Sequence, residues 1–130
     1  MGTRTADFGL RRIGQIAVNV QDLQRATAFY RDVLGIRLLF EVPGMAFFDC
    51  GEVRLMLGKA EQPELDHRAS IIYYRVDDIA AAYRRLVERG VEFMHEPRMV
   101  HKTDESELWM AFLRDSEENV LALMSEVPVV

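Results

Sequence analysis

The stretch that decides the fold occurs twice in the chain. Residues 13–41 read IGQIAVNVQDLQRATAFYRDVLGIRLLFE, and residues 69–96 read ASIIYYRVDDIAAAYRRLVERGVEFMHE. The two stretches align at an offset of 56 positions, with one residue dropped before the glycine, so that Gly35 matches Gly90. A single internal repeat of this kind indicates that one structural unit has been duplicated.

Each copy is predicted to open with a strand and to continue as a helix. In the first copy, alternation places an apolar face opposite Gln15; this face consists of Ile16, Val18 and Val20. The apolar residues that follow recur at helical spacing. Each helix should begin after an N-capping aspartate, Asp22 or Asp78, and should end at the glycine, which adopts a positive φ at little cost.

After each glycine the pattern returns to period two, which predicts three more strands in each copy. These strands are expected in residues 36–42, 45–51 and 53–59, and again in residues 91–97, 108–115 and 119–125. We therefore predict a single domain over residues 1–130, made of two βαβββ modules at about 12–58 and 69–126 with a polar linker at 59–68. The predicted fold class is α+β, a cup-shaped curved mixed sheet with both helices on its convex face.

Composition and charge exclude several classes of function. The 130 residues are 49% hydrophobic and 28% charged, which suits one ordinary domain. The formal net charge of -5 argues against nucleic-acid binding, and no apolar run approaches the roughly 18 residues of a membrane-spanning helix. The single cysteine, Cys50, fits a reducing compartment. We expect a cytoplasmic protein that binds neither nucleic acid nor membranes.

The paired modules resemble the vicinal oxygen chelate superfamily, which includes glyoxalase I, bleomycin-resistance proteins and extradiol dioxygenases. The resemblance is carried by the duplicated helix and glycine and by FLRDSEENVLALMSE at residues 112–126, and it covers about residues 12–126. It implies a homodimer whose cups are completed either by the same chain or by its partner. In members that use a metal, it also implies one ligand on the first and last strand of each module.

Gln15 matches the first of these ligand positions, where glutamine replaces histidine in some glyoxalase I relatives. The other three positions offer no donor, because Ile71 matches Gln15 in the repeat, and matching EVRLML to NVLALM pairs Leu55 with Ala122. A shift of one residue in either direction yields no set of histidines and carboxylates. Because a divalent ion requires about four to six N, O or S donors, we expect no metal and no other cofactor.

Without a metal, the predicted cup is apolar and aromatic. Its concave side is expected to carry Gln15, Ala17, Leu55, Leu57, Ile71, Tyr73, Ala122 and Met124, with Phe40, Phe48, Met94 and Trp109 as further wall or lid residues. A largely apolar concavity with a few polar groups is typical of a small-molecule site. These positions are therefore the candidate ligand-binding residues, with Gln15 and Tyr73 orienting the ligand.

His101 is the candidate catalytic residue, because a histidine folded over the cup is suited to proton transfer near neutral pH. It lies in VHKTDESE, residues 100–107, which the pattern predicts to be a solvated loop between strands. Together with His95 and the neighbouring acidic residues it matches no metal-ligand motif.

Three functions remain open from the sequence. The favoured hypothesis is a metal-independent protein of the bleomycin-resistance type that binds a flat, partly apolar small molecule. The second is an enzyme of the glyoxalase group, a lyase, isomerase or dioxygenase, although the fold by itself does not establish an activity. The third is a structural or interaction domain in which side chains fill the cup.

Overall fold

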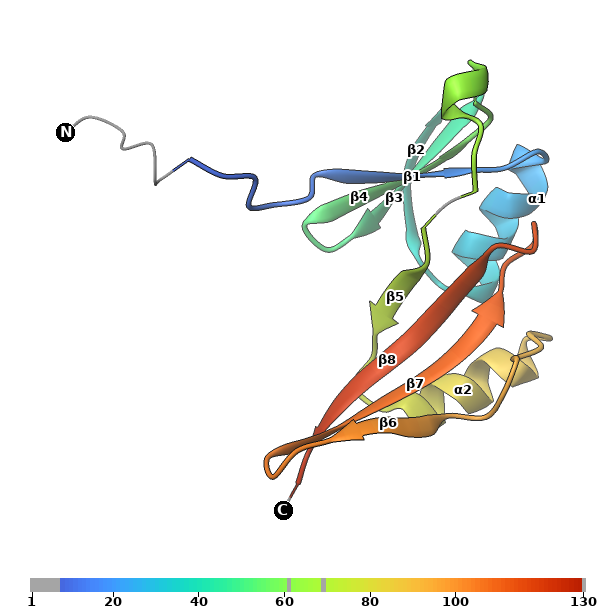
Figure 1. The fold of residues 1–130 in the computed structure, drawn as a ribbon. Helices are drawn as coiled ribbons and strands as arrows, with labels where there is room; N and C mark the ends of the chain where they lie inside the picture. Colours follow the sequence, from blue (N-terminus) through green and yellow to red (C-terminus); the bar gives the residue numbers. More distant parts are fainter. Residues whose placement is uncertain (1–7, 61, 69, 130) are drawn as a thin grey trace.

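The computed structural model describes residues 8–60, 62–68 and 70–129. Two four-stranded mixed sheets follow one another along the chain, in the strand order β1-β4-β3-β2 for sheet A and β5-β8-β7-β6 for sheet B (Figure 1). In each sheet the first strand is parallel to the last, and the remaining pairs are antiparallel. The predicted α+β architecture of two tandem βαβββ modules is therefore confirmed.

The elements of the first module are β1 (Gln15–Asn19), α1 (Leu23–Ala28), the π-helical turn η2 (Phe29–Val33), β2 (Arg37–Val42), β3 (Met45–Cys50) and β4 (Val53–Gly58). A short 3-10 turn, η3 (Pro63–Leu65), lies between the modules. The elements of the second module are β5 (Ile72–Arg75), α2 (Ile79–Glu88), β6 (Arg98–Lys102), β7 (Ser106–Arg114) and β8 (Val120–Pro128).

Each helix packs on one face of its own sheet, and that face forms the core of the module. The core of sheet A contains Val18, Tyr30, Phe48, Leu55 and Leu57, and that of sheet B contains Leu86, Val91, Ala111, Leu113, Leu121 and Leu123. The opposite face of each sheet carries neither α1 nor α2, and we call it the concave face (Figure 1). Burial of apolar side chains under the helices therefore leaves the concave faces available for function.

The two helices differ by one residue, and a π turn accommodates the difference. Asp22 and Gly35 are 13 positions apart, whereas Asp78 and Gly90 are 12 positions apart. In η2 the amide of Leu34 donates to the carbonyl of Phe29, a bond that spans five residues instead of four. Both helices nevertheless begin at the predicted aspartates, whose side chains accept from the amides of Arg25 and Ala81.

A buried carboxylate joins the two modules. Asp115, in the turn before β8, is 4% exposed and accepts a hydrogen bond of 2.7 Å from the hydroxyl of Tyr30 on the first helix. The same carboxylate accepts from the amides of Glu117 and Asn119 and from the side-chain amide of Asn119. Burial and the neighbouring Asp115 raise the pKa of Tyr30, which keeps its hydroxyl protonated as a donor.

Two further contacts tie the first helix to the second module. The carboxylate of Glu117 accepts from the amides of Gln21 and Asp22, at 2.9 and 2.8 Å, just before α1 begins. At the other end of the helix, Arg89 donates from Nη1 to the carbonyl of Val33 at 2.8 Å. The first helix is therefore held at both ends by residues of the second module.

One predicted strand was wrong. Residues 91–97 contain no strand, and only Phe93 forms an isolated bridge, to Leu113. The edge strand is β6 instead, which includes His101 and part of the stretch predicted to be a loop. All five residues of β6 are exposed, so the strand has no buried face. Its sequence therefore lacks the alternation of apolar and polar residues that identifies a strand.

Candidate functional site on the concave face of sheet A

A row of polar side chains crosses all four strands of sheet A. The strand register aligns Arg37 on β2 with Asp49 on β3, Asp49 with Arg54 on β4, and Arg54 with Gln15 on β1. Arg54 donates from Nε to the Oε1 atom of Gln15 at 2.8 Å, and Arg37 pairs with Asp49 at 3.6 Å. The polar row thus contains two arginines, one carboxylate and one neutral amide.

An apolar row lies next to the polar row on the same face. It consists of Phe40, Phe47, Met56 and Ala17, which the register aligns across the four strands. The rings of Phe40 and Phe47 stack at 4.6 Å between centroids, and the guanidinium carbon of Arg54 lies 5.0 Å from the centroid of Phe47. Gln15 contacts this row through its Nε2 atom, 3.8 Å from the sulfur of Met56. The rows are therefore in direct contact.

Beyond the apolar row, the linker between the modules covers the concave face and encloses a cavity of about 310 Å³. Asn19 donates to the carbonyls of Leu65 and His67, at 2.6 and 3.0 Å, which fixes the linker over the sheet. Gly58 is required at the floor, because a Cβ there would lie 3.0 Å from the carbonyl oxygen of Gly44. The cavity is lined by Ala17, Asn19, Met45, Met56, Gly58, Lys59, Ala60, Gln62, Leu65 and His67.

The concave face of sheet B is filled by contacts among its own side chains. The register aligns Tyr73 with Ala122 and Ala122 with Phe112. The ring of Phe112 contacts Tyr73 at 5.7 Å and His95 at 5.6 Å between centroids. Ala122 beneath them is 0% exposed. Of the arginines on this face, Arg75 binds Glu126 at 3.0 Å, and Arg98 donates from Nε to Nδ1 of His95 at 3.2 Å.

The candidate residues divide between the two faces of the sheets. Gln15, Ala17, Phe40, Tyr73, Ala122 and Met124 lie on the concave faces. Ile71 precedes β5 and is exposed, and the amide of Met94 donates to the carbonyl of Phe112 at 2.8 Å. Sequence reasoning therefore placed Gln15 and Tyr73 on the correct face of their strands.

The placement of Leu55, Leu57 and Phe48 on the concave side was wrong. All three are at most 2% exposed and belong to the core beneath α1. The pairing of Ile16 with Leu55 and of Ile72 with Leu121 shows that Leu55 matches Leu121, so the alignment of β4 with β8 was displaced by one residue. A slip of one residue exchanges the two faces of a strand. The side chain that faces the cup next to Gln15 is Arg54, which the sequence interpretation missed.

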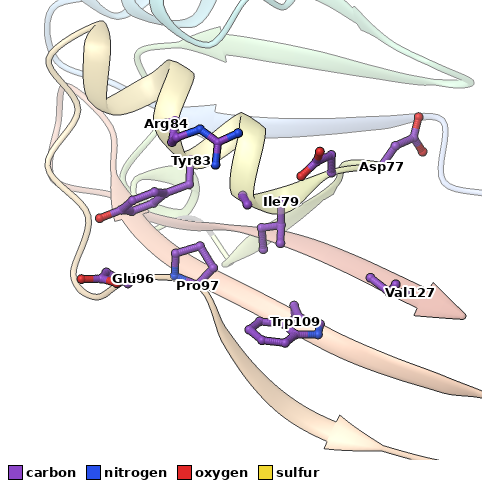
Figure 2. Close-up of a pocket in the computed structure, with 10 residues that line it drawn as sticks. Asp77, Ile79, Tyr83, Arg84, Glu96, Pro97, Trp109 and Val127 are labelled. Carbon is purple, nitrogen blue, oxygen red and sulfur yellow. The ribbon is translucent and has the colours of Figure 1, made fainter. Parts of the chain in front are cut away.

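The placement of Trp109 in the cup was also wrong. Trp109 pairs with Met99 and Ser125 on the helix-covered face of sheet B, and its indole N–H donates to Glu107 at 3.0 Å. It lines a separate cavity of about 610 Å³ between α2 and β7, together with Ile79, Tyr83 and Pro97 (Figure 2). This cavity lies on the opposite side of the sheet from the concave face.

The residues of the cup do not fit a divalent metal. Near the superfamily's ligand positions, the concave face of sheet A offers the amide of Gln15, the thioether of Met56 and the cationic guanidinium of Arg54. Ile71 and Ala122 add no donor. A guanidinium has no lone pair to give and repels a cation. His101 lies on the exposed edge strand β6, and the described residues contain no group of three or more His, Cys, Asp or Glu that could hold a metal ion.

Comparison with known proteins agrees with this architecture. The Glyoxalase/Bleomycin resistance protein/Dioxygenase superfamily matches residues 12–123. The chain belongs to this superfamily. The chain is also similar to YetH of Bacillus subtilis (strain 168), to which it is 26% identical over 124 residues that cover 88% of this chain and 98% of YetH. In addition, no helix of the described residues is long and apolar enough to span a membrane.

Solved structures of the superfamily share the fold. TnmS3, an antibiotic binding protein from Streptomyces sp. CB03234, superposes with a TM-score of 0.70 at 25% identity, covering 94% of this chain and 99% of TnmS3. Lactoylglutathione lyase from Agrobacterium tumefaciens superposes with a TM-score of 0.66 at 22% identity, covering 88% of this chain and 92% of the lyase. One fold therefore occurs both in a binding protein and in an enzyme, and the choice between these functions must be argued from the site.

Proposed function

We propose that the protein binds a small, partly apolar organic molecule on the concave face of sheet A without using a metal. The observation that carries this proposal is the stacked pair of Phe40 and Phe47, whose neighbour in the strand register, Met56, lines the cavity under the linker. Apolar walls with a few polar groups are typical of ligand sites. The function of TnmS3 as an antibiotic binding protein supports the same class of activity.

Apolar burial is expected to supply most of the affinity. Covering roughly 200 Å² of apolar surface contributes about 5 kcal/mol, whereas a hydrogen bond to a neutral amide contributes only about 0.5–1.5 kcal/mol. Phe40, which is 45% exposed, and the apolar lining of the cavity should therefore determine the strength of binding, and Gln15 should determine the orientation of the ligand. An enzymatic role for His101 is less well supported, because its strand lies at the far edge of sheet B.

We also propose that the protein is a homodimer in which the second copy covers the exposed edge strands. Leu39 and Val42 on β2 are 41% and 39% exposed, and Met99 and Val100 on β6 are 45% and 48% exposed. Both strands are outer strands of their sheets, and exposed apolar edges favour association. Sedimentation equilibrium should give twice the mass of the chain; a monomer at micromolar concentration would contradict this part of the proposal.

A cytoplasmic location and the absence of a nucleic-acid partner complete the proposal. The formal net charge of -5 disfavours binding to phosphates. Cys50 is a free thiol, and burial, together with Asp49, raises its pKa, which keeps it protonated and unreactive.

The test uses N-phenyl-1-naphthylamine, a neutral fluorescent molecule with two linked aromatic groups. We expect saturable binding to protein treated with EDTA, and elemental analysis should find no stoichiometric transition metal. Ala17→Trp places an indole in the cavity and should weaken binding at least tenfold, because Ala17 is exposed and lines that cavity. Ala80→Trp is the matched control, since Ala80 is exposed in the cavity beside α2. Equal affinities in the two variants would contradict the site.

A further inference from the structure

The guanidinium of Arg54 indicates the charge of the ligand. We propose that the concave face of sheet A selects aromatic molecules that carry an oxyanion, such as a carboxylate or sulfonate, and that Arg54 binds this group. This inference rests on the proposed binding function and adds the chemical class of the ligand to it.

The first argument is the geometry of Arg54. Its Nε atom donates a hydrogen bond to Oε1 of Gln15 at 2.8 Å, and its guanidinium carbon lies 5.0 Å from the ring centroid of Phe47. In the described ranges 8–60, 62–68 and 70–129, no hydrogen bond or ion pair reaches either of its Nη atoms. A guanidinium fixed through Nε retains two terminal groups, which together match the two oxygens of an oxyanion.

The second argument is the balance of charge along the polar row. Asp49 lies opposite Arg54 in the register, but its ion pair is formed with Arg37. The row contains two arginines and one carboxylate, so one positive charge remains uncompensated there. Among the residues that line the adjacent cavity, Lys59 is cationic and none is a carboxylate. This face is locally basic in a chain whose formal net charge is -5.

The third argument is the position of the apolar row. Phe47 contacts both Arg54 and Phe40 and is only 8% exposed, so the open aromatic surface is that of Phe40, which is 45% exposed. A flat ring placed against Phe40 and over the apolar row lies on the same face of the sheet as the guanidinium of Arg54. The guanidinium fork of arginine can donate two parallel hydrogen bonds to two oxygens of one oxyanion, which the single ammonium of lysine does not reproduce. The arrangement therefore favours an aromatic acid over a neutral aromatic molecule of the same size.

The experiment compares two fluorescent probes that share one ring system. 8-Anilinonaphthalene-1-sulfonate carries a sulfonate that N-phenyl-1-naphthylamine lacks. We expect the sulfonate to bind the wild-type protein at least tenfold more tightly than the neutral probe, because charge-assisted hydrogen bonds are strong. Arg54→Gln should remove this preference while lowering the affinity for the neutral probe by less than threefold, and Arg54→Lys should retain part of the preference.

Arg84→Gln is the matched control, because Arg84 is an exposed arginine that lines the cavity beside α2 (Figure 2). It should leave the preference for the sulfonate intact, and circular dichroism should show that all three variants are folded. If both probes bind the wild-type protein equally, or if Arg54→Gln keeps the preference, this inference is wrong and the proposed function stands. If neither probe binds, the proposed function is wrong, and this inference, which rests on it, is wrong as well.

Discussion

The concave faces of the two sheets differ in the side chains that they carry and in the space beside them. On sheet A, Arg54 bonds to the neutral amide of Gln15, and its charge has no acidic partner in the described part of the chain. On sheet B, Arg75 pairs with Glu126 at 3.0 Å, Arg98 donates to the imidazole of His95 at 3.2 Å, and Tyr73 packs against Phe112. The two copies of one backbone thus differ in their concave faces: Met56 in the apolar row of sheet A lines the cavity under the linker, whereas Ala122 of sheet B is 0% exposed. We propose a binding role for the face of sheet A alone.

The two helices also differ, because only the first one is packed against both modules. Each helix packs on its own sheet. In addition, Phe29, Val33 and Leu34 at the end of the first helix pack against the core of sheet B. Asp115 and Glu117 of the second module also accept hydrogen bonds from the first helix and from the residues just before it. The joint between the modules therefore depends on one helix, and substitutions there should have larger effects than matched substitutions elsewhere.

The largest expected effect is at Asp115. Asp115→Ala leaves the hydroxyl of Tyr30 and the amides of Glu117 and Asn119 without an acceptor in a buried site. We expect the free energy of unfolding in urea to fall by about 3–5 kcal/mol. Asp104→Ala, in the exposed turn between β6 and β7, should change it by less than about 0.5 kcal/mol. Similar losses in the two variants would show that Asp115 does not hold the modules together.

Removal of the hydroxyl should change the free energy of unfolding in opposite directions at Tyr30 and Tyr74. Tyr30→Phe removes the bond to Asp115 and should lower the free energy of unfolding by about 2 kcal/mol. The hydroxyl of Tyr74 is buried without a partner in the described residues, so Tyr74→Phe should raise stability by up to about 1 kcal/mol. Urea unfolding of both variants measures the difference. A loss of stability in Tyr74→Phe would reveal a partner for that hydroxyl.

Alkaline pH should lower the free energy of unfolding of the wild-type protein. Burial raises the pKa of both Tyr30 and Tyr74 in the folded state above the ordinary value of 10.0. The unfolded chain therefore releases these protons first, so the stability present below pH 10 is lost as the pH rises above it. Each tyrosine should contribute a decrease of about 1.4 kcal/mol per pH unit. Unfolding followed at pH 9 to 11 should show a shallower decrease in Tyr30→Phe; an unchanged slope would contradict the assignment.

The smallest expected effect is at Gln15. Gln15→Leu removes the acceptor that holds Nε of Arg54, and the loss of one such bond corresponds to about 0.5–1.5 kcal/mol. We expect the affinity for 8-anilinonaphthalene-1-sulfonate to fall about threefold in a fluorescence titration. Gln24→Leu, on the exposed side of α1, is the control and should have no effect. A loss as large as that of Arg54→Gln would make Gln15 a direct partner of the sulfonate.

The sequence predicted the order of the elements because the repeat, the capping aspartates and the glycines are local signals. It placed Gln15 correctly because β1 has one clearly apolar face. It failed at Leu55 because the alignment of β4 with β8 was displaced by one residue. It failed at Trp109 because β7 carries apolar residues on both faces, so alternation does not choose between them. The face is set by the register of pairing with β1 and β8, which depends on loop lengths that no residue pattern encodes.

The π turn in the first helix has a consequence for the history of the duplication. The additional residue lies inside the helix, whose two ends are bonded to Glu117 and Arg89 of the other module. With both ends anchored, an inserted residue can be absorbed only by widening a turn between them. The two halves are consequently no longer interchangeable. A protein built from two first modules would lack the acidic turn that receives the helix, and one built from two second modules would lack the helix that fills the joint.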